Sequence, residues 1–384
     1  MTFSTQDILA RLIAFPTVSR DPNRALIDWV ANLLTDAEID PVIIPDESGK
    51  KANLYATIGP TDRAGVMLSG HTDVVPVDGQ NWTRPPFDLT RFEGRLYGRG
   101  TADMKGFCAA AINAACQAAA LDLATPLHLA LSYDEEIGCM GVRSLVTMLK
   151  TAPVRPMMCI VGEPTAMAVA SGHKGKAALK AICHGQEGHS ALAPFALNAL
   201  HLAVDFAGKI REKQAQLALS GNVDNDYDVP YTTLHIGRIN GGDALNIVPN
   251  RAEIDFEIRN LAEDSPADII ADLRIAADKI TTATGHEAAV IEIQECWSYP
   301  GLLTPQNADV VAFVKSLTGA NSTFKVAFGT EGGLFSADLD VPTVICGPGS
   351  MMQGHKPDEY VAEDQLAACD KMLAELLARL KAGL

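Results

Sequence analysis

Hydrophobic and polar residues follow one rhythm in the first part of the chain. Short apolar runs alternate with stretches in which apolar residues recur every three or four positions, the spacings of buried strands and amphipathic helices. The pattern predicts helices over 5–15, 23–37, 104–120 and 141–150, and strands over 53–58, 65–70, 127–133 and 157–162. Strands that alternate with helices in this way predict an α/β fold with a mostly parallel sheet.

The rhythm changes after the segment SGHKGK, residues 171–176. The pattern there predicts strands over 176–184, 232–239, 251–259 and 288–295, and helices over 196–218 and 265–284. This order is a ferredoxin-like βαββαβ unit. The acidic segment 220–230 is expected to be its main exposed loop.

The α/β pattern resumes with helix 306–318, strand 341–346 and a last helix over 363–381. We therefore expect a first domain of residues 1–174 and 298–384, interrupted by a second domain of residues 175–297.

Potential metal ligands follow several of the predicted strands. His71 in SGHTDVVP, Glu136 in DEEIG and Glu163 in VGEPT each come directly after an apolar run. Such positions lie at the carboxyl ends of strands, where open α/β sheets carry their sites. Asp103 in GRGTADMKG and His355 in QGHKPDE add a carboxylate and an imidazole, and His355 lies after the predicted insertion. Both ends of the first domain must therefore meet at such a site.

Nitrogen and carboxylate donors without a thiolate suit catalytic rather than structural zinc. If Asp103 bridges, one Zn²⁺ takes His71 and Glu163 and a second takes Glu136 and His355. Two such ions would lie about 3.5–4 Å apart, with a water molecule between them as the expected nucleophile.

Two further carboxylates adjoin the ligands. Glu135 directly precedes Glu136, and we expect it to act as the general base that moves a proton from the water to the departing amine. Asp73 follows His71 by two residues. It is expected to accept the second ring N–H of that histidine and to fix its tautomer.

Each motif alone has a simpler interpretation. An acidic triplet such as DEE often marks a solvated loop or a helix N-terminus, and a single histidine such as His71 is often a hydrogen-bonded core residue. The stretch GRLYGRGTADMKG has the glycines of a phosphate-binding turn, but it lacks both the GxGxxG order and the GK[ST] ending. Five motifs with mutually compatible ligands favour a metal site over independent solvated loops.

The motifs SGHTDVVPVDG, GRLYGRGTADMKGFCAA, SYDEEIGCMGV, VGEPT, SGHKGK and CGPGSMMQGHKPDEYV resemble those of the acetylornithine deacetylase and succinyl-diaminopimelate desuccinylase family. The resemblance spans nearly the whole chain, and DMKGF, SGHKGK and FGTEGG are most similar to the acetylornithine deacetylase branch. It implies a dizinc amidohydrolase with a catalytic domain of the zinc-exopeptidase type, in which Co²⁺ can substitute for Zn²⁺, and a smaller lid that forms a homodimer.

The resemblance also implies roles for residues in the lid. His189, in a glycine-rich turn, matches a histidine that reaches the active site of a partner subunit and stabilises the oxyanion. Arg259 and Asn246 match substrate contacts, and an arginine suits a bidentate carboxylate. Without the family, His189 would be an ordinary surface-turn residue and Arg259 a solvated charge at a strand end.

The GTEGG loop, residues 329–333, is a further candidate for substrate binding. Glycines such as Gly329 let a backbone approach a ligand closely, and Thr330 lies beside it. Charge alone suggests that Glu331 accepts the ammonium of an ornithine side chain, with a solvated loop glutamate as the alternative.

Composition limits the classes of partner. A chain of 384 residues, 47% hydrophobic and 20% charged, can bury two moderate cores. A net charge of −16 argues against nucleic acid and anionic membrane surfaces. The eight cysteines form no CxxC pair, so we expect reduced thiols. The N-terminal segment lacks the basic region of a signal peptide, and a cytoplasmic location is the expected default.

These observations lead to one main functional hypothesis. The expected reaction is hydrolysis of an N-acyl L-amino acid, with N-acetyl-L-ornithine first and arginine biosynthesis as the pathway. Succinyl-diaminopimelate desuccinylation and a broad aminoacylase or dipeptidase activity need the same metal site and stay open. A non-catalytic metal-binding module is disfavoured, because metal binding alone requires neither Glu135 nor His189.

Overall fold

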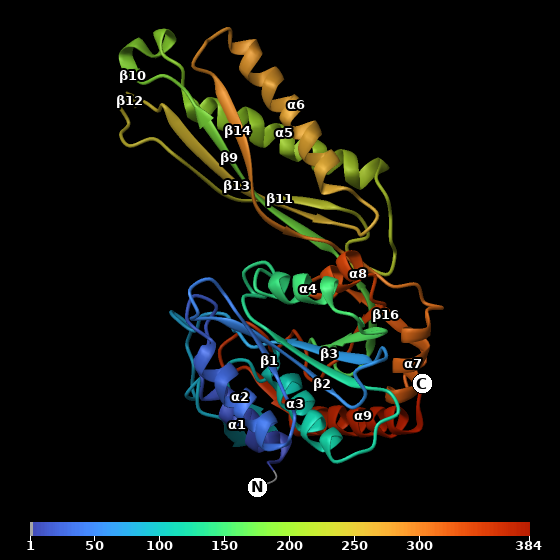
Figure 1. Ribbon diagram of the computed structural model, residues 1–384. Helices are drawn as coiled ribbons and strands as arrows, with labels where there is room; N and C mark the ends of the chain where they lie inside the picture. The colour runs from blue at the N-terminus through green and yellow to red at the C-terminus, as the bar shows by residue number, and fades with distance from the viewer. Residues whose placement is uncertain (1–2) are drawn as a thin grey trace. The chain divides into compact units, whose positions relative to one another are not determined.

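The computed structural model describes residues 3–384, which form two compact units (Figure 1). The first unit contains the chain up to Gly172, Leu302–Lys325 and Thr330–Leu384, and the second contains His173–Gly301 and Val326–Gly329. The predicted limits, after residue 174 and before residue 298, differ from these by a few residues. The short return of 326–329 to the second unit was not predicted.

The first unit is built on a nine-stranded mixed sheet of order β1-β2-β6-β3-β7-β17-β8-β15, with β16 paired to β8. Its strands are β1 (Val42–Pro45), β2 (Ala52–Ile58), β3 (Val66–His71), β6 (Leu127–Ser132), β7 (Met158–Val161), β8 (Val169–His173), β15 (Leu302–Leu303), β16 (Thr323–Val326) and β17 (Thr343–Ile345). Strands β6, β3, β7 and β17 are parallel, whereas β1, β2 and β8 join antiparallel. The expected α/β fold with a mostly parallel sheet is confirmed at the centre of the sheet.

Helices cover both faces of this sheet. They are α1 (Thr5–Ile13), α2 (Arg24–Asp36), α3 (Lys105–Ala119), α4 (Val142–Thr151), α7 (Asp309–Thr318), α8 (Gly332–Leu339) and α9 (Glu363–Ala382). Helices α1, α3 and α9 pack together on one face, and α4 and α8 pack together on the other (Figure 1). A small sheet of β4 (Thr90–Phe92), β5 (Arg95–Tyr97) and β18 (Tyr360–Ala362) joins two distant parts of the chain.

Side-chain size explains why α3 lies so close to the sheet. The alanine-rich helix is buried along most of its length, and β3 and β6 are buried at every position. At Gly162, directly after β7, an added Cβ would lie 1.9 Å from Cγ of Phe107 on α3. Only glycine allows this approach, which seats α3 under the strand ends.

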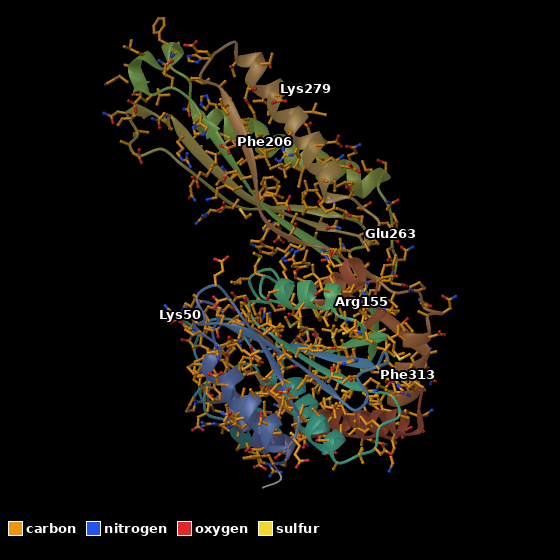
Figure 2. All side chains as sticks on the ribbon, in the orientation of Figure 1. Lys50, Arg155, Phe206, Glu263, Lys279 and Phe313 are labelled. Carbon is orange, nitrogen blue, oxygen red and sulfur yellow. The ribbon has the colours of Figure 1, made fainter. Side chains whose placement is uncertain are left out.

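The second unit is a four-stranded antiparallel sheet of order β11-β13-β9-β14 with two helices on one face. Its elements are β9 (Gly175–His184), α5 (Ala199–Ser220), β11 (Thr233–Gly241), β13 (Arg251–Asn260), α6 (Pro266–Thr284) and β14 (Val290–Tyr299). Alternate residues of β13 are buried, as a sheet with one covered face requires. Phe206 of α5, labelled in Figure 2, packs edge-on against Phe256 of β13 with ring centroids 6.2 Å apart. The order of these elements along the chain, β9-α5-β11-β13-α6-β14, is the predicted βαββαβ order.

A short ribbon extends from the second unit near the start of β13. It consists of β10 (Gly188–His189), the 3₁₀ helix η1 (Ser190–Phe195) and β12 (Ile247–Val248). The acidic segment 220–230 is mostly exposed, with Tyr227 as its buried residue. Across residues 3–384, no helix is both long and apolar enough to cross a membrane.

Candidate metal and active site

Three predicted ligand motifs lie at one edge of the central sheet. His71 is the last residue of β3, and it pairs in register with Ser132, the last residue of β6. Glu136 follows β6 by four residues and Glu163 follows β7 by two. Because β6, β3 and β7 are adjacent and parallel, the three motifs emerge side by side.

Two loops bring the remaining ligands to this edge. Asp103 lies in the turn between β5 and α3, and His355 lies in the segment before β18. Pairing of Tyr97 in β5 with Tyr360 in β18 joins these two segments. His355 has a left-handed backbone with a φ of 62°, and its side chain is 43% exposed.

Asp103 lies between the two histidines, with one oxygen directed to each. Its Oδ1 is 3.1 Å from Nε2 of His71, and its Oδ2 is 3.1 Å from Nε2 of His355. Glu163 Oε1 is 3.6 Å from His71 Nε2, and Glu136 Oε2 is 3.1 Å from His355 Nε2. The structure therefore brings the five predicted ligands into two groups that share one carboxylate.

The crowding of charge in this buried site fits divalent cations. Burial raises the pKa of Glu136 to about 7, and the charge of Asp103 adds to the effect. Burial likewise raises the pKa of Glu163 well above its usual value. Hydrogen bonds to Asp103 and Glu136 raise the pKa of His355 to about 10. These buried carboxylates can all stay ionised only if positive charge lies among them. Their oxygens and the histidine nitrogens are also the ligand atoms of catalytic metal sites.

Asp73 holds the DEE motif against the end of β3. Its carboxylate accepts the backbone N–H groups of Glu135 at 3.1 Å and Glu136 at 3.3 Å, and the Ser19 hydroxyl at 2.7 Å. For His71 Nδ1 the nearer acceptor is the main-chain carbonyl of Asp73, at 3.0 Å, and the carboxylate is 3.5 Å away. A carbonyl can only accept, so Nδ1 carries the proton and Nε2 is left to bind an ion.

Glu135 lies beside His71 and Glu163, with ligand atoms of the three within 4.8 Å of one another. Its Oε1 also accepts a hydrogen bond from the buried thiol of Cys139, with an S···O distance of 3.4 Å. Burial raises the pKa of Glu135 well above its usual value. The position allows either proton transfer at the site or a direct bond to an ion.

The predicted lid residues belong to the second unit and lie in two places. His189 and Asn246 are neighbours on the β10–β12 ribbon, where the N–H of Ser190 donates to the carbonyl of Asn246 at 3.0 Å. Arg259 is near the far end of β13, and its guanidinium donates to Glu257 at 3.0 Å and lies 3.5 Å from the Tyr299 hydroxyl. At about 3.3 Å per residue, the eight positions from Arg251 to Arg259 span roughly 26 Å.

The GTEGG loop begins in the second unit and continues in the first. At Gly329, an added Cβ would lie 2.2 Å from the Tyr299 ring. The hydroxyl of Thr330 is buried and accepts the N–H of Gly332 at 3.0 Å. Glu331 is also buried, and it accepts hydrogen bonds from Ser132 and, at 3.2 Å, from Ser69. Its contact with a substrate ammonium stays a prediction.

Sequence reasoning assigned no role to Arg99 and Glu359, although both lie in the ligand motifs GRGTADMKG and QGHKPDE. They form a buried ion pair with an N···O distance of 2.6 Å. A charged residue between two glycines, as Arg99 is between Gly98 and Gly100, is a signal that could have drawn attention to it, whereas Glu359 stands in a charged stretch and gives no such signal.

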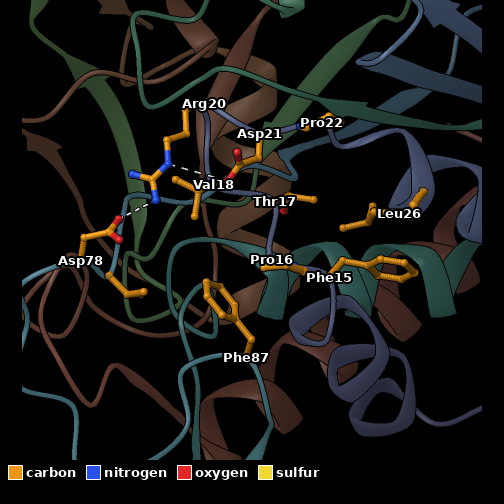
Figure 3. Close-up of a pocket in the computed structure, with 12 residues that line it drawn as sticks. Phe15, Pro16, Thr17, Val18, Arg20, Asp21, Pro22, Leu26, Asp78 and Phe87 are labelled. Carbon is orange, nitrogen blue, oxygen red and sulfur yellow. Dashed lines mark hydrogen bonds and ion pairs between the residues drawn. The ribbon is translucent and has the colours of Figure 1, made fainter.

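A separate surface cavity of about 460 Å³ lies along residues 15–22 of the first unit (Figure 3). Arg20 and Asp78 form an exposed ion pair on its wall, 2.6 Å apart. Its lining includes none of the predicted site residues.

Comparison with known proteins identifies the family of the chain. Residues 67–379 match the model of the peptidase family M20/M25/M40. The chain is 33% identical over 379 residues to the acetylornithine deacetylase of Pasteurella multocida (strain Pm70), and the match covers 97% of each protein.

Solved structures with lower identity share the fold. An M20 family metallo-carboxypeptidase from Sulfolobus solfataricus matches with a TM-score of 0.80 and 18% identity, over 99% of this chain and all of that one. A dinuclear metal-binding peptidase of the M20 family from Bacillus subtilis matches with a TM-score of 0.66 and 16% identity, over 97% of this chain and 96% of that one. The resemblance drawn from the motifs is confirmed: the chain belongs to the peptidase family M20/M25/M40 and is a metal-dependent amidohydrolase.

Proposed function

We propose that this chain hydrolyses the amide bond of an N-acyl L-amino acid, with N-acetyl-L-ornithine as the preferred substrate and arginine biosynthesis as its pathway. The observation that carries the proposal is the placement of Asp103, with one oxygen 3.1 Å from each of two histidines. The 33% identity to an acetylornithine deacetylase over 97% of the chain supports the choice of substrate.

Two metal ions fit the donors, Zn²⁺ first and Co²⁺ as a substitute. His71 and Glu163 would hold one ion, Glu136 and His355 the other, and Asp103 would bind both. When bound, such ions polarise the amide carbonyl and lower the pKa of a water molecule. The Asp73 carbonyl supports this arrangement, because it keeps the proton of His71 on Nδ1.

Glu135 is the proposed general base. Its carboxylate takes a proton from the attacking water as the new C–O bond forms at the acyl carbon. It then delivers that proton to the amine as the C–N bond breaks, so that carboxylate and free amine are released. Asp73 sets the position of Glu135 through its backbone N–H.

The lid residues act on two different sites in this proposal. Arg259 binds the carboxylate of the amino acid, and His189, with Asn246 beside it, serves the site of a partner subunit. A substrate of two residues spans about 7 Å. Arg259 and Arg251 are roughly 26 Å apart along β13, and the ribbon that carries His189 lies at the Arg251 end of the sheet. One lid therefore does not place Arg259 and His189 on the same molecule. His189 Nδ1 accepts the N–H of Ala191 at 3.1 Å, which leaves Nε2 as a donor for an oxyanion.

Exposed apolar side chains near His189 support a homodimer through the lid. Leu192, Phe195 and Leu245 are 57%, 83% and 101% exposed, and they lie on or beside the ribbon that carries His189. Apolar residues gathered in this way are typical of surfaces that a partner covers.

The test is kcat/KM for N-acetyl-L-ornithine, N-succinyl-LL-diaminopimelate and N-acetyl-L-methionine, with and without a chelator. We expect chelator-sensitive hydrolysis with a preference for acetylornithine of about 100-fold or more, near 2.7 kcal/mol of discrimination. A preference for the succinylated substrate would identify a desuccinylase, and similar rates would identify a broad aminoacylase. Absence of turnover on all three substrates would contradict the proposal.

A further inference from the structure

Arg99 and Glu359 form a buried ion pair that takes no part in the proposed chemistry. Their side chains are each 1% exposed, and Nη1 of Arg99 lies 2.6 Å from Oε2 of Glu359. A buried pair of this kind is weak support for stability, because desolvation of both charges offsets much of their attraction. The hydrogen bonds of the pair to the backbone of two loops indicate a positioning role instead.

Glu359 holds the loop that carries Asp103. Its second oxygen, Oε1, accepts the backbone N–H groups of Gly100, Ala102 and Asp103 at 3.1, 2.9 and 3.0 Å. Gly100 has a left-handed φ of 89°, and an added Cβ would lie 2.8 Å from a Val74 methyl group. The turn thus folds around one carboxylate oxygen and ends at the residue placed between the two histidines.

Arg99 holds the segment that carries His355. Its Nη1 donates to the carbonyl of Lys356 at 3.3 Å, and its Nη2 donates to Oε1 of Gln80 at 2.6 Å. Nε2 of Gln80 donates in turn to the carbonyl of His355 itself, at 3.1 Å. The His355 side chain is 43% exposed, so packing alone does not fix it and these backbone contacts set its position.

We infer that Arg99, Glu359 and Gln80 form a clamp that positions Asp103 and His355 for a shared metal ion. The clamp joins residues more than 250 positions apart in sequence. It is expected to act most on the ion held by Asp103, Glu136 and His355, because it contacts the loops of two of these ligands. Of the ligands of the other ion, it contacts only the loop of Asp103. The inference rests on the proposed metal site and adds the residues that keep its two halves together.

The test is Zn²⁺ binding to the full-length, metal-stripped protein by isothermal titration calorimetry at fixed pH. Glu359→Gln keeps an oxygen for the backbone N–H groups but removes the charge opposite Arg99. The matched control is Glu363→Gln, which breaks an exposed Arg91–Glu363 pair with N···O distances of 2.7 and 2.6 Å. We expect Glu359→Gln to weaken one of two bound ions at least tenfold, and the control to stay within twofold of the wild type.

A second variant covers the case in which Glu359→Gln does not fold. Gln80→Ala removes the link between Arg99 and the His355 carbonyl without leaving a carboxylate unpaired, and Gln80 lies in a partly exposed loop. We expect several-fold weaker binding of the same ion. Wild-type affinity for both ions in folded Gln80→Ala overturns the inference. A wild-type protein that binds no pair of ions would instead overturn the proposed function.

Discussion

Aspartate 73 connects the ligand histidine to the proposed base. Its carboxylate accepts the backbone N–H groups of both Glu135 and Glu136, and its carbonyl fixes the tautomer of His71. Residues that hold metal ligands in place commonly matter nearly as much as the ligands themselves. The side chain therefore acts through the backbone of the DEE motif more than through the imidazole.

Asp73→Asn should lower kcat by about 10- to 100-fold, because an amide has one acceptor oxygen for the two N–H groups. The exposed Asp78, paired with Arg20 at 2.6 Å, offers a control five residues away. Steady-state assays of both variants check this expectation. Equal losses in Asp73→Asn and Asp78→Asn would argue against a specific role for Asp73.

A buried histidine away from the site should make stability depend on pH. His128 in β6 stacks on Tyr55 with ring centroids 5.6 Å apart, and burial lowers its pKa to about 4. An unfolded histidine titrates near 6.5. Between these values the unfolded chain binds a proton that the folded chain does not. The contribution of His128 to the free energy of unfolding is therefore complete above about pH 6.5 and is lost as the pH falls toward 4.

His128→Phe removes this titration and keeps a ring against Tyr55. From pH 7 to pH 5 the wild type should lose roughly 2 kcal/mol more unfolding free energy than the variant. Chemical denaturation of both metal-free proteins at the two pH values measures the difference. Parallel losses in the two proteins would exclude His128 as the source.

At the scale of elements, long periodic segments were predictable and short paired ones were not. The eight predicted helices all occur, as α1–α7 and α9, whereas the unpredicted strands β4, β5, β10, β12 and β18 have two or three residues each. Strands of that length form because a distant segment pairs with them, as Tyr97 does with Tyr360. A similar difference applies to the site. The metal ligands could be predicted because only a few side-chain types bind metal ions, but the Arg99–Glu359 pair could not, because it depends on tertiary packing.

The close approach of α3 to the strand ends gives a test at this scale. Gly162→Ala would place a Cβ 1.9 Å from the Phe107 ring. We expect a loss of about 1–3 kcal/mol, as in other overpacked cores. Gly208, within α5, has no atom within 4 Å of an added Cβ, so Gly208→Ala should instead gain up to about 1 kcal/mol.

Urea unfolding of both variants measures these changes. A Gly162→Ala protein as stable as the wild type would mean that α3 does not pack as closely as described. A destabilised Gly208→Ala protein would contradict the absence of atoms around an added Cβ at this position of α5.

At the scale of the whole molecule, the first unit is assembled from both ends of the chain. Strand β17, which follows the insertion, lies between β7 and β8, which precede it. His355 likewise comes from the later segment and Asp103 from the earlier one. The expectation of an insertion rested on the change of pattern after residue 176 and on ligands that lie on both sides of it. The exact boundaries of the two units and the return of residues 326–329 to the second unit could not be predicted, because they depend on contacts such as that of Gly329 with Tyr299.

All five proposed ligands belong to the first unit. Metal binding should therefore slow hydrogen exchange around residues 70–73, 100–106, 133–139 and 353–359, because ligand binding stabilises the structure that forms the site. Exchange-mass spectrometry with Zn²⁺ and with a chelator checks this expectation. Protection confined to residues 173–301 would place the ions elsewhere.

The most direct test of the hydrolytic centre is to measure turnover and bound metal in the same preparation of Glu135→Ala. We expect both ions to be retained and kcat to fall by about 100- to 10,000-fold, because the variant lacks the group that transfers the proton. Loss of an ion together with turnover would show that Glu135 is a ligand. Retention of wild-type turnover would contradict its assignment as the base.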